Sequence, residues 1–184
     1  RDESLGLRAF SDADWAGDKA DRKSTSGFVV FLGSHPIAWG TKKQTCVALS
    51  TMEAEYVALC LAAKEIVWLS RLIAFSKSPQ VRSGLQVFCD NKSAIFLACD
   101  GNVSERSKHI DIKYHFIKKL VDDGIISIEH VGTKDMVADI CTKGLGALEH
   151  ANKSKMLMHR GPAGPGLRRT DVPLKGGYVK DSVQ

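Results

Sequence analysis

The longest amphipathic segment of the chain, residues 49–75, predicts a single long helix. Its apolar side chains recur at a spacing of 3.6 residues and form one stripe along the helix. The residues of this stripe are Met52, Tyr56, Leu59, Ala62, Ala63, Ile66, Leu69 and Ile73. Because such a stripe is buried against another layer of secondary structure, the segment predicts a layered domain whose core this helix covers.

Shorter segments on both sides of this helix predict the other layer. Five β-rich runs occur, at residues 5–12, 27–33, 36–41, 85–90 and 125–131. Three further helical patterns occur, at residues 91–99, 109–123 and 135–143. The order β-β-β-α-β-α-α-β-α predicts an α/β fold with one mixed sheet covered by helices. Residues 160–184 are rich in Gly and Pro without periodicity, so we predict a domain at 1–159 and a flexible tail at 160–184.

Composition excludes several classes of protein. The 184 residues, 43% hydrophobic and 26% charged, have the size and balance of one globular domain. The longest apolar run, 57–63, is far shorter than the roughly 20 residues that span a bilayer. Five cysteines without a CxxC motif favour reduced thiols and argue against a zinc site. With no signal-peptide pattern and no initiator Met, we expect an intracellular fragment of a longer protein, without a membrane partner.

Two carboxylates near the start of the long helix lie at different angles around it. With Met52 at zero and about 100° per residue, Glu55 falls at about −60°, inside the apolar stripe, and Glu53 at about +100°, outside it. Ser50 and Glu53 have the spacing of a capping box, which explains Glu53 structurally. A buried carboxylate is costly unless it is paired or used. For Glu55 a core salt bridge and a functional role therefore both stay open.

Three aspartates add to this pattern. Asp12 and Asp90 each end a predicted strand, and Asp139 lies one turn into the last predicted helix. Each alone has an ordinary explanation as a turn residue, an N-cap or a partner of the helix dipole. If Asp12 and Asp90 lie on adjacent parallel strands beneath Glu55, however, the carboxylates converge and require cations. Oxygen ligands select Mg²⁺ or Mn²⁺, and two such ions about 4 Å apart can promote phosphodiester hydrolysis.

Seven segments of the chain carry a resemblance to a known family. They are SDADWAGD, RKSTSGFVVFLG, PIAWGTKKQ, ALSTMEAEYVAL, VFCDNKSAI, SKHIDIKYHFIKK and VADICTKGL. From about residue 5 to about residue 160 the chain resembles the ribonuclease H domain of copia-type LTR retrotransposon Pol polyproteins. The resemblance implies a ribonuclease H-like fold, a five-stranded mixed sheet flanked by helices. It also implies a metal-dependent endonuclease that hydrolyses the RNA strand of RNA–DNA hybrids during reverse transcription.

The resemblance also implies which residues form the site. In the family pattern four acids would hold two Mg²⁺ or Mn²⁺ ions: Asp12, Glu55, Asp90 and Asp139. It selects Glu55 over Glu53, as the helical wheel does, and leaves Asp14 as the second choice for the first position. The family His in the loop before the last helix is missing, because residues 132–135 contain none. We interpret His130 as structural and expect slow turnover if a histidine is needed.

Six residues are candidates for substrate binding. They are Ser50, Thr51, Lys42, Lys43, Asn91 and Lys108. A helix N-terminus can hold a phosphate and lysines can contact the backbone of a nucleic acid, whereas capping and a solvated polar face are the structural alternatives. The net charge of +5 adds little, since much of it comes from the predicted tail. We interpret Trp15, Trp39 and Trp68 as core or near-core packing.

The expected partners are an RNA–DNA hybrid and the reverse transcriptase domain of the same polyprotein. The expected location is the cytoplasm, in a virus-like particle, or the nucleus. The first alternative is a catalytically weak or inactive remnant that binds nucleic acid or packs against a reverse transcriptase. The second is another nuclease or transferase on the same sheet, such as an integrase or exonuclease, because one fold hosts many activities.

Overall fold

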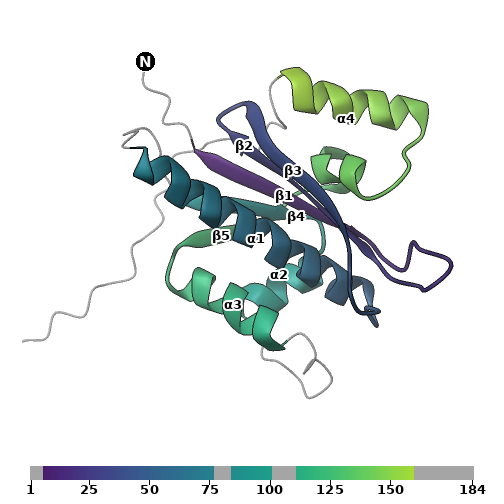
Figure 1. Cartoon of the computed structure of the whole chain (residues 1–184), viewed down its shortest axis with the longest axis horizontal. Coiled ribbons are helices and arrows are strands. Elements are labelled where there is room, and N and C mark those ends of the chain that lie inside the picture. The colour runs from purple at the N-terminus through teal and green to yellow at the C-terminus, as the bar shows by residue number, and fades with distance from the viewer. Residues whose placement is uncertain (1–5, 77–83, 101–110, 160–184) are drawn as a thin grey trace, which may run out of the picture.

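The computed structural model describes residues 6–76, 84–100 and 111–159 and contains a five-stranded mixed sheet flanked by helices (Figure 1). The strands are β1 (Leu7–Asp14), β2 (Thr25–Leu32), β3 (His35–Lys43), β4 (Leu85–Cys89) and β5 (Ile126–His130). The helices are α1 (Thr51–Phe75), α2 (Lys92–Cys99), α3 (Asp111–Asp122) and α4 (Ala147–His159), with short 3-10 turns η2 (Thr133–Asp135) and η3 (Val137–Cys141). This architecture confirms the predicted fold class.

The strand order β3-β2-β1-β4-β5 places β1 at the centre of the sheet. β1 is antiparallel to β2 and parallel to β4, which is in turn parallel to β5. The carboxyl ends of β1, β4 and β5 therefore meet at one edge of the sheet. The β1–β4 register pairs Phe10 with Phe88, so its continuation brings Asp12 beside Asp90. The prediction that these two aspartates belong to adjacent parallel strands is confirmed.

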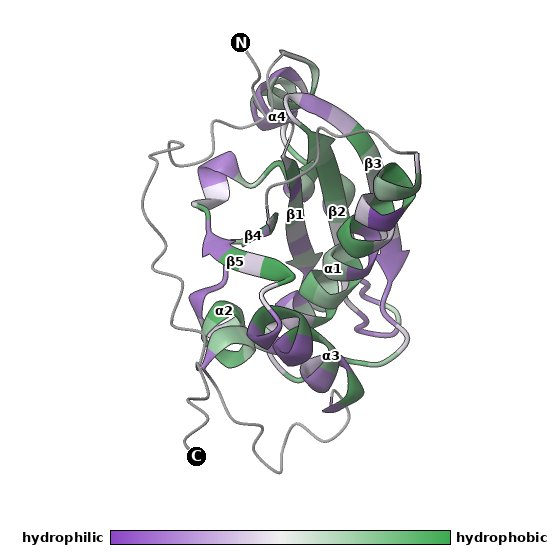
Figure 2. Cartoon of the chain, turned by 90° about the vertical axis from the view of Figure 1, so that its left-hand side faces the viewer, coloured by the Kyte–Doolittle hydropathy of each residue, from purple (hydrophilic) through white to green (hydrophobic). Residues whose placement is uncertain are grey.

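Two apolar cores fill the two faces of the sheet. Because side chains alternate along a strand, Leu7 and Ala9 of β1 pack with α1, whereas Phe10 packs with η3. Ring stacking of Phe10 on Phe88, with centroids 4.8 Å apart, joins β1 to β4 in the smaller core. Figure 2 shows the largely hydrophobic colouring of β1 and β2. The end of the central strands is thus packed on both faces of the sheet.

Three sequence-based boundaries need correction. β1 extends to Asp14, so Asp12 lies inside the strand and does not end it. The predicted helix at 135–143 is wrong, because Met136 is extended and separates η2 from η3. The side chain of Thr142 also returns to the Asp139 carbonyl (3.2 Å), a local bond that competes with a regular helix. α4 was not predicted, since its apolar residues form no continuous stripe and Leu148 is exposed.

The interpretation of the three tryptophans as core residues is wrong. Trp15, Trp39 and Trp68 are 45%, 68% and 57% exposed. Trp39 belongs to β3, which is an edge strand, and the Trp15 indole N–H donates to the Ala48 carbonyl (3.0 Å). Within the described residues, no helix is long and apolar enough to cross a membrane. The predicted tail at 160–184 lies outside the described residues.

Candidate metal centre

Glu55 is held over the end of β1 by the start of α1. Ser50 is the N-cap of α1, and its Oγ accepts the Glu53 N–H (3.2 Å). One turn further on, Glu55 is buried, and its Oε1 accepts the N–H of Ala13 in β1 (3.2 Å). Its Oε2 is also buried and has no hydrogen-bond partner, and Glu55 forms no ion pair with any lysine or arginine that the structure describes. The core salt bridge is therefore not what explains this carboxylate.

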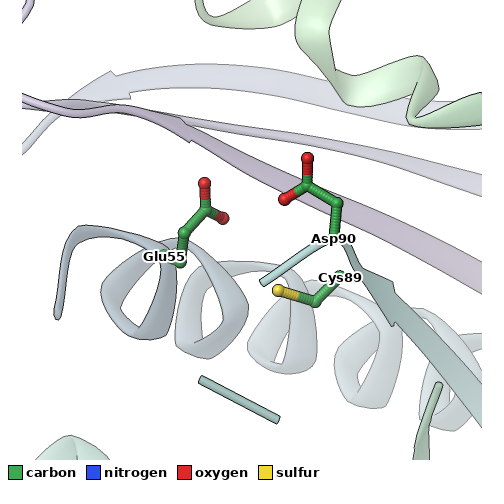
Figure 3. Close-up of side chains that lie close together, drawn as sticks. All are labelled: Glu55, Cys89 and Asp90. Atoms are coloured by element: carbon green, nitrogen blue, oxygen red, sulfur yellow. The ribbon is translucent and has the colours of Figure 1, made fainter. Parts of the chain in front are cut away.

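Asp90 faces Glu55 across the end of β4. It follows β4 directly, and its Oδ2 accepts the Thr133 O–H (3.0 Å). Glu55, Cys89 and Asp90 each offer one ligand atom, and these atoms lie within 4.8 Å of one another (Figure 3). Burial raises the pKa of the Cys89 thiol to about 12, so it stays protonated at neutral pH and is a poor ligand. The donors that remain are carboxylates, which select hard cations.

Asp12 and Asp139 are also close together, but the chain supplies cations to both. Asp12 is buried, accepts the Thr142 O–H, and lies 3.6 Å from Lys143 Nζ. Asp139, in η3, is fully buried and pairs with Lys143 Nζ (2.8 Å) and Lys153 Nζ (2.9 Å). Asp139 therefore has a structural role, because it forms ion pairs with two lysines.

Two of the four acids, Glu55 and Asp12, have raised pKa values to which neighbouring carboxylates contribute. Burial first, and then the charges of Asp12 and Asp90, raise the pKa of Glu55 to about 9. Burial also raises the pKa of Asp12 to about 6, although the Thr142 hydrogen bond and Lys143 oppose this, and Asp139 and Asp90 add to it. Like charges gathered in a low-dielectric site favour a bound cation. All four predicted acids therefore contribute to one electrostatic cluster.

The donor set fits one or more divalent metal ions. Its ligand atoms are carboxylate oxygens, and the buried Oε2 of Glu55 is the oxygen that a cation would satisfy. Asp14, the second choice, lies against the turn at Gly17, where a Cβ would be 1.9 Å from Asp14 Oδ2. Its charge is absent from those that shift the pKa of Asp12 or Glu55. The geometry thus favours Asp12 over Asp14.

Glu53 differs from the expectation in two respects. It is buried, although the helical wheel placed it outside the apolar stripe. Its Oε2 accepts the N–H of Leu49 (2.8 Å), the residue before the N-cap, whereas a standard capping box uses the N-cap N–H. The Ser50 N-cap is confirmed, and the Glu53 carboxylate has a structural role one residue earlier than expected.

Most of the candidate substrate residues have structural contacts. Asn91 is the N-cap of α2 and accepts the Ala94 N–H (3.0 Å). Lys43 pairs with Asp18 and Asp21. Thr51 and Lys42 are exposed, and Lys42 has no ion pair with a described residue. Lys108 lies outside the described residues.

Sequence reasoning missed the polar side chains that hold Asp12, Asp90 and Asp139 in place. They are Thr133, Thr142, Lys143 and Lys153. Lys143 follows Asp139 by four residues, a spacing that signals an ion pair in the helix predicted there. Lys153 gave no signal, because α4 was not predicted. His130, interpreted as structural, is exposed at the end of β5.

The chain is similar in sequence to parts of several transposon polyproteins. No family model matches the chain. The retrovirus-related Pol polyproteins from transposons RE2 and RE1 of Arabidopsis thaliana are 40% and 42% identical, over 84% and 81% of this chain. The Pol polyprotein from transposon TNT 1-94 of Nicotiana tabacum is 40% identical over 74% of it. The chain spans about 10% of the length of each of these relatives.

Solved structures of ribonucleases H share the fold. LC11-RNase H1, isolated from compost by a metagenomic approach, has a TM-score of 0.57 at 12% identity, over 75% of this chain and 93% of its own. The N-terminal RNase H domain of a Mycobacterium tuberculosis protein has a TM-score of 0.56 at 16% identity, over 83% and 98%. LC11-RNase H1 in complex with an RNA/DNA hybrid has a TM-score of 0.53 at 15% identity, over 74% and 93%. The chain therefore has the ribonuclease H fold and is a homologue of one segment of the retrovirus-related Pol polyproteins from transposons.

Proposed function

We propose that this chain is a divalent-metal-dependent endonuclease that hydrolyses the RNA strand of RNA–DNA hybrids as part of a transposon Pol polyprotein. One observation carries the proposal: the buried, unpartnered Oε2 of Glu55 faces Asp90 where the two central parallel strands end. The Pol polyprotein relatives and the ribonuclease H fold support it. LC11-RNase H1, a neighbour in fold, is known in complex with an RNA/DNA hybrid, which supports the substrate class.

The residues that would hold the metal are Asp12, Glu55, Asp90 and Asp139. Two Mg²⁺ or Mn²⁺ ions would supply charge stabilisation at the scissile phosphate and an activated water. The chain fixes the orientation of the ligands: the Ala13 N–H holds Glu55, the Thr133 hydroxyl holds Asp90, and the Thr142 hydroxyl holds Asp12. Preorganised ligands of this kind avoid a cost of rearrangement during the reaction.

Electrostatics explain why the site would need a cation to function. With a pKa of about 9, the Glu55 carboxyl holds its proton at neutral pH unless positive charge compensates the ionised form. Lys143 supplies such charge to Asp12 and Asp139. The charge of Lys143 also acts on Glu55 and Asp90, but no lysine or arginine among the described residues forms an ion pair with either, so an added cation would act mainly on these two acids.

Substrate selection would depend on exposed polar groups, such as Thr51 at the start of α1 and Lys42 on β3. Selection of RNA requires contacts with 2′-hydroxyls across the shallow minor groove. Thr51 and Lys42 are exposed and free to make such contacts or phosphate contacts. We also propose that the partner domain is the reverse transcriptase of the same polyprotein, since the homologues are Pol polyproteins.

The test is incubation of the purified chain with Mg²⁺ or Mn²⁺ and end-labelled RNA–DNA hybrid, duplex DNA or single-stranded RNA. We expect cleavage of the hybrid alone, with 5′-phosphate and 3′-hydroxyl ends. Asp12→Asn and Glu55→Gln should abolish it while circular dichroism shows an intact fold. Cleavage of duplex DNA in preference to the hybrid would contradict the proposal.

A second candidate function is a nucleic-acid-binding remnant without catalysis. The observation that favours it is the pair of lysines on Asp139, which satisfies this acid without any metal. Binding of the hybrid without cleavage, unchanged by Glu55→Gln, would support this second function and contradict the first.

A further inference from the structure

The two lysines that pair with Asp139 are held very differently. Lys153 is 2% exposed, and its Nζ donates to the carbonyls of Thr133 (2.7 Å), Lys134 (3.1 Å) and Met136 (2.8 Å) in addition to its ion pair. It comes from α4 and joins that helix to the turns that carry Asp139. With four oxygen partners and almost no exposed surface, its ammonium group is a fixed part of the fold.

Lys143 has a far looser attachment. Its partners among the described residues are two carboxylates, Asp139 Oδ1 at 2.8 Å and Asp12 Oδ2 at 3.6 Å. Its side chain is 37% exposed, and the residue follows η3, where the chain has left regular structure. No backbone carbonyl among the described residues accepts a hydrogen bond from its Nζ. The side chain can therefore turn into solvent without breaking any other contact.

We propose that Lys143 is a displaceable counter-cation that competes with a divalent metal for Asp12 and Asp139, whereas Lys153 is a positioning residue that stays on Asp139. This inference rests on the proposed function, because it takes the metal centre as given. An ammonium group and a divalent cation that use the same carboxylate oxygens repel each other strongly at such short separations. Of the two lysines only Lys143 can move away from the carboxylates, so the metal would displace Lys143 and not Lys153.

The competition has a measurable consequence on both sides. Each cation weakens the binding of the other by the same factor, because coupling between two binding equilibria is reciprocal. Lys143 thus keeps Asp12 and Asp139 compensated when metal is scarce, and lowers the metal affinity of the site. Lys153 does not exchange with the metal, because its ammonium group stays on Asp139 in both states.

The first experiment measures the reactivity of individual lysines in the wild-type chain. The chain is treated with an amine-reactive label, in EDTA and in Mn²⁺, and the modified sites are quantified by mass spectrometry. Labelling of Lys143 should rise several-fold with Mn²⁺, whereas Lys153 should stay protected in both conditions. Lys155, an exposed residue two positions further along α4, provides the control for reagent effects. Unchanged or reduced labelling of Lys143 would overturn the proposal.

The second experiment measures Mn²⁺ affinity by calorimetry. Lys143→Met should bind Mn²⁺ about tenfold more tightly than the wild type, within the usual range of coupling between sites. Lys143→Arg keeps the charge and should restore the wild-type affinity, and Lys155→Met should leave it unchanged. If folded Lys143→Met and the folded wild type bind Mn²⁺ with equal affinity, Lys143 does not compete with the metal and the proposal is wrong.

Failure of this inference can be told apart from failure of the proposed function. A wild-type chain that responds in both metal experiments but cleaves no hybrid would refute the nuclease activity alone. A chain that cleaves the hybrid, but whose Lys143 labelling and Mn²⁺ affinity show no response, would refute the role of Lys143 alone.

Discussion

The acidic cluster has two halves, Asp12 with Asp139 and Glu55 with Asp90, whose carboxylate charges are compensated in different ways. In the Asp12–Asp139 half, Lys143 and Lys153 approach the carboxylates to 3.6 Å or less. In the Glu55–Asp90 half, the described contacts are an N–H from Ala13 and a hydroxyl from Thr133, with one buried oxygen unpartnered. Burial of an acid therefore does not by itself identify a metal ligand. The supply of compensating charge distinguishes the two halves.

This difference in charge compensation predicts which half would depend on an external cation. A neutral donor orients a carboxylate but compensates its charge only in part, whereas an ammonium group compensates it directly. The Glu55–Asp90 half is therefore oriented without being neutralised, and the other half is largely neutralised within the fold. Each of the following predictions contrasts variants of the two halves.

The largest expected effect is on catalysis, in the half that lacks lysines. Glu55→Gln and Asp90→Asn should each reduce hybrid cleavage by roughly a thousandfold or more, as expected when charge stabilisation at the reacting phosphate is lost. Glu53→Gln is the matched control, two residues away on the same helix and equally buried. Single-turnover cleavage assays with Mg²⁺ measure the effect. Comparable losses for Glu53→Gln and Glu55→Gln would remove the distinction between these two acids.

The next largest effect is on stability, in the half that contains lysines. Asp139→Asn should lower the free energy of unfolding by about 3–5 kcal/mol, because it leaves the buried Lys153 without its counter-charge. Glu55→Gln should have no such cost, since Glu55 forms no ion pair with a described lysine or arginine and its carboxyl is protonated at neutral pH without metal. Urea unfolding followed by circular dichroism, in EDTA, compares the two. A greater loss of stability for Glu55→Gln than for Asp139→Asn would reverse the comparison.

A smaller effect is the pH dependence of stability. The ordinary pKa of a glutamate is 4.5, and in the folded chain the pKa of Glu55 is raised to about 9. Between these two pH values the folded state therefore holds a proton on Glu55 that the unfolded state has lost. Stability from this group is full below the lower pKa and falls as pH rises toward the higher one, by at most about 1.4 kcal/mol per pH unit. Glu55→Gln removes this slope, so the variant should gain on the wild type as pH rises.

Unfolding in urea with EDTA, between about pH 6.5 and about pH 8.5, measures this difference above the pKa of Asp12. Lys143→Arg serves as a variant in the other half that keeps all carboxylates. Parallel pH profiles for the wild type and Glu55→Gln would show that Glu55 is already ionised without metal.

The smallest effect concerns the cap of α1. Glu53→Gln should lower the free energy of unfolding by about 1 kcal/mol, since it weakens the bond to the Leu49 N–H without removing an acid from the site. Hybrid cleavage should remain at the wild-type rate once the protein is folded. Thermal unfolding and the cleavage assay together test this, and a strong loss of cleavage at full stability would place Glu53 in the metal centre.

The sequence predicted the parts of the site that depend on local periodicity. Glu55 emerged from the 3.6-residue stripe of α1, and Asp12 and Asp90 from the ends of β-rich runs that lie on adjacent parallel strands. The burial of Glu53 escaped prediction, because a helical wheel describes the helix alone and not the turn before it. Lys153 escaped because it depends on contacts across the chain between α4 and the loop at 133–136.

The anchorage of Lys153 has a consequence for where the functional unit ends. α4 contributes little to the apolar cores, and Leu148 and Met158 are exposed. It does, however, deliver the one ammonium that is shared by Asp139 and three peptide carbonyls. A truncation before Ala147 would remove the partly buried Met156 and Leu157 from the smaller core and also one of the two ammonium groups on Asp139. The requirement for α4 thus comes from charge balance as well as from hydrophobic burial.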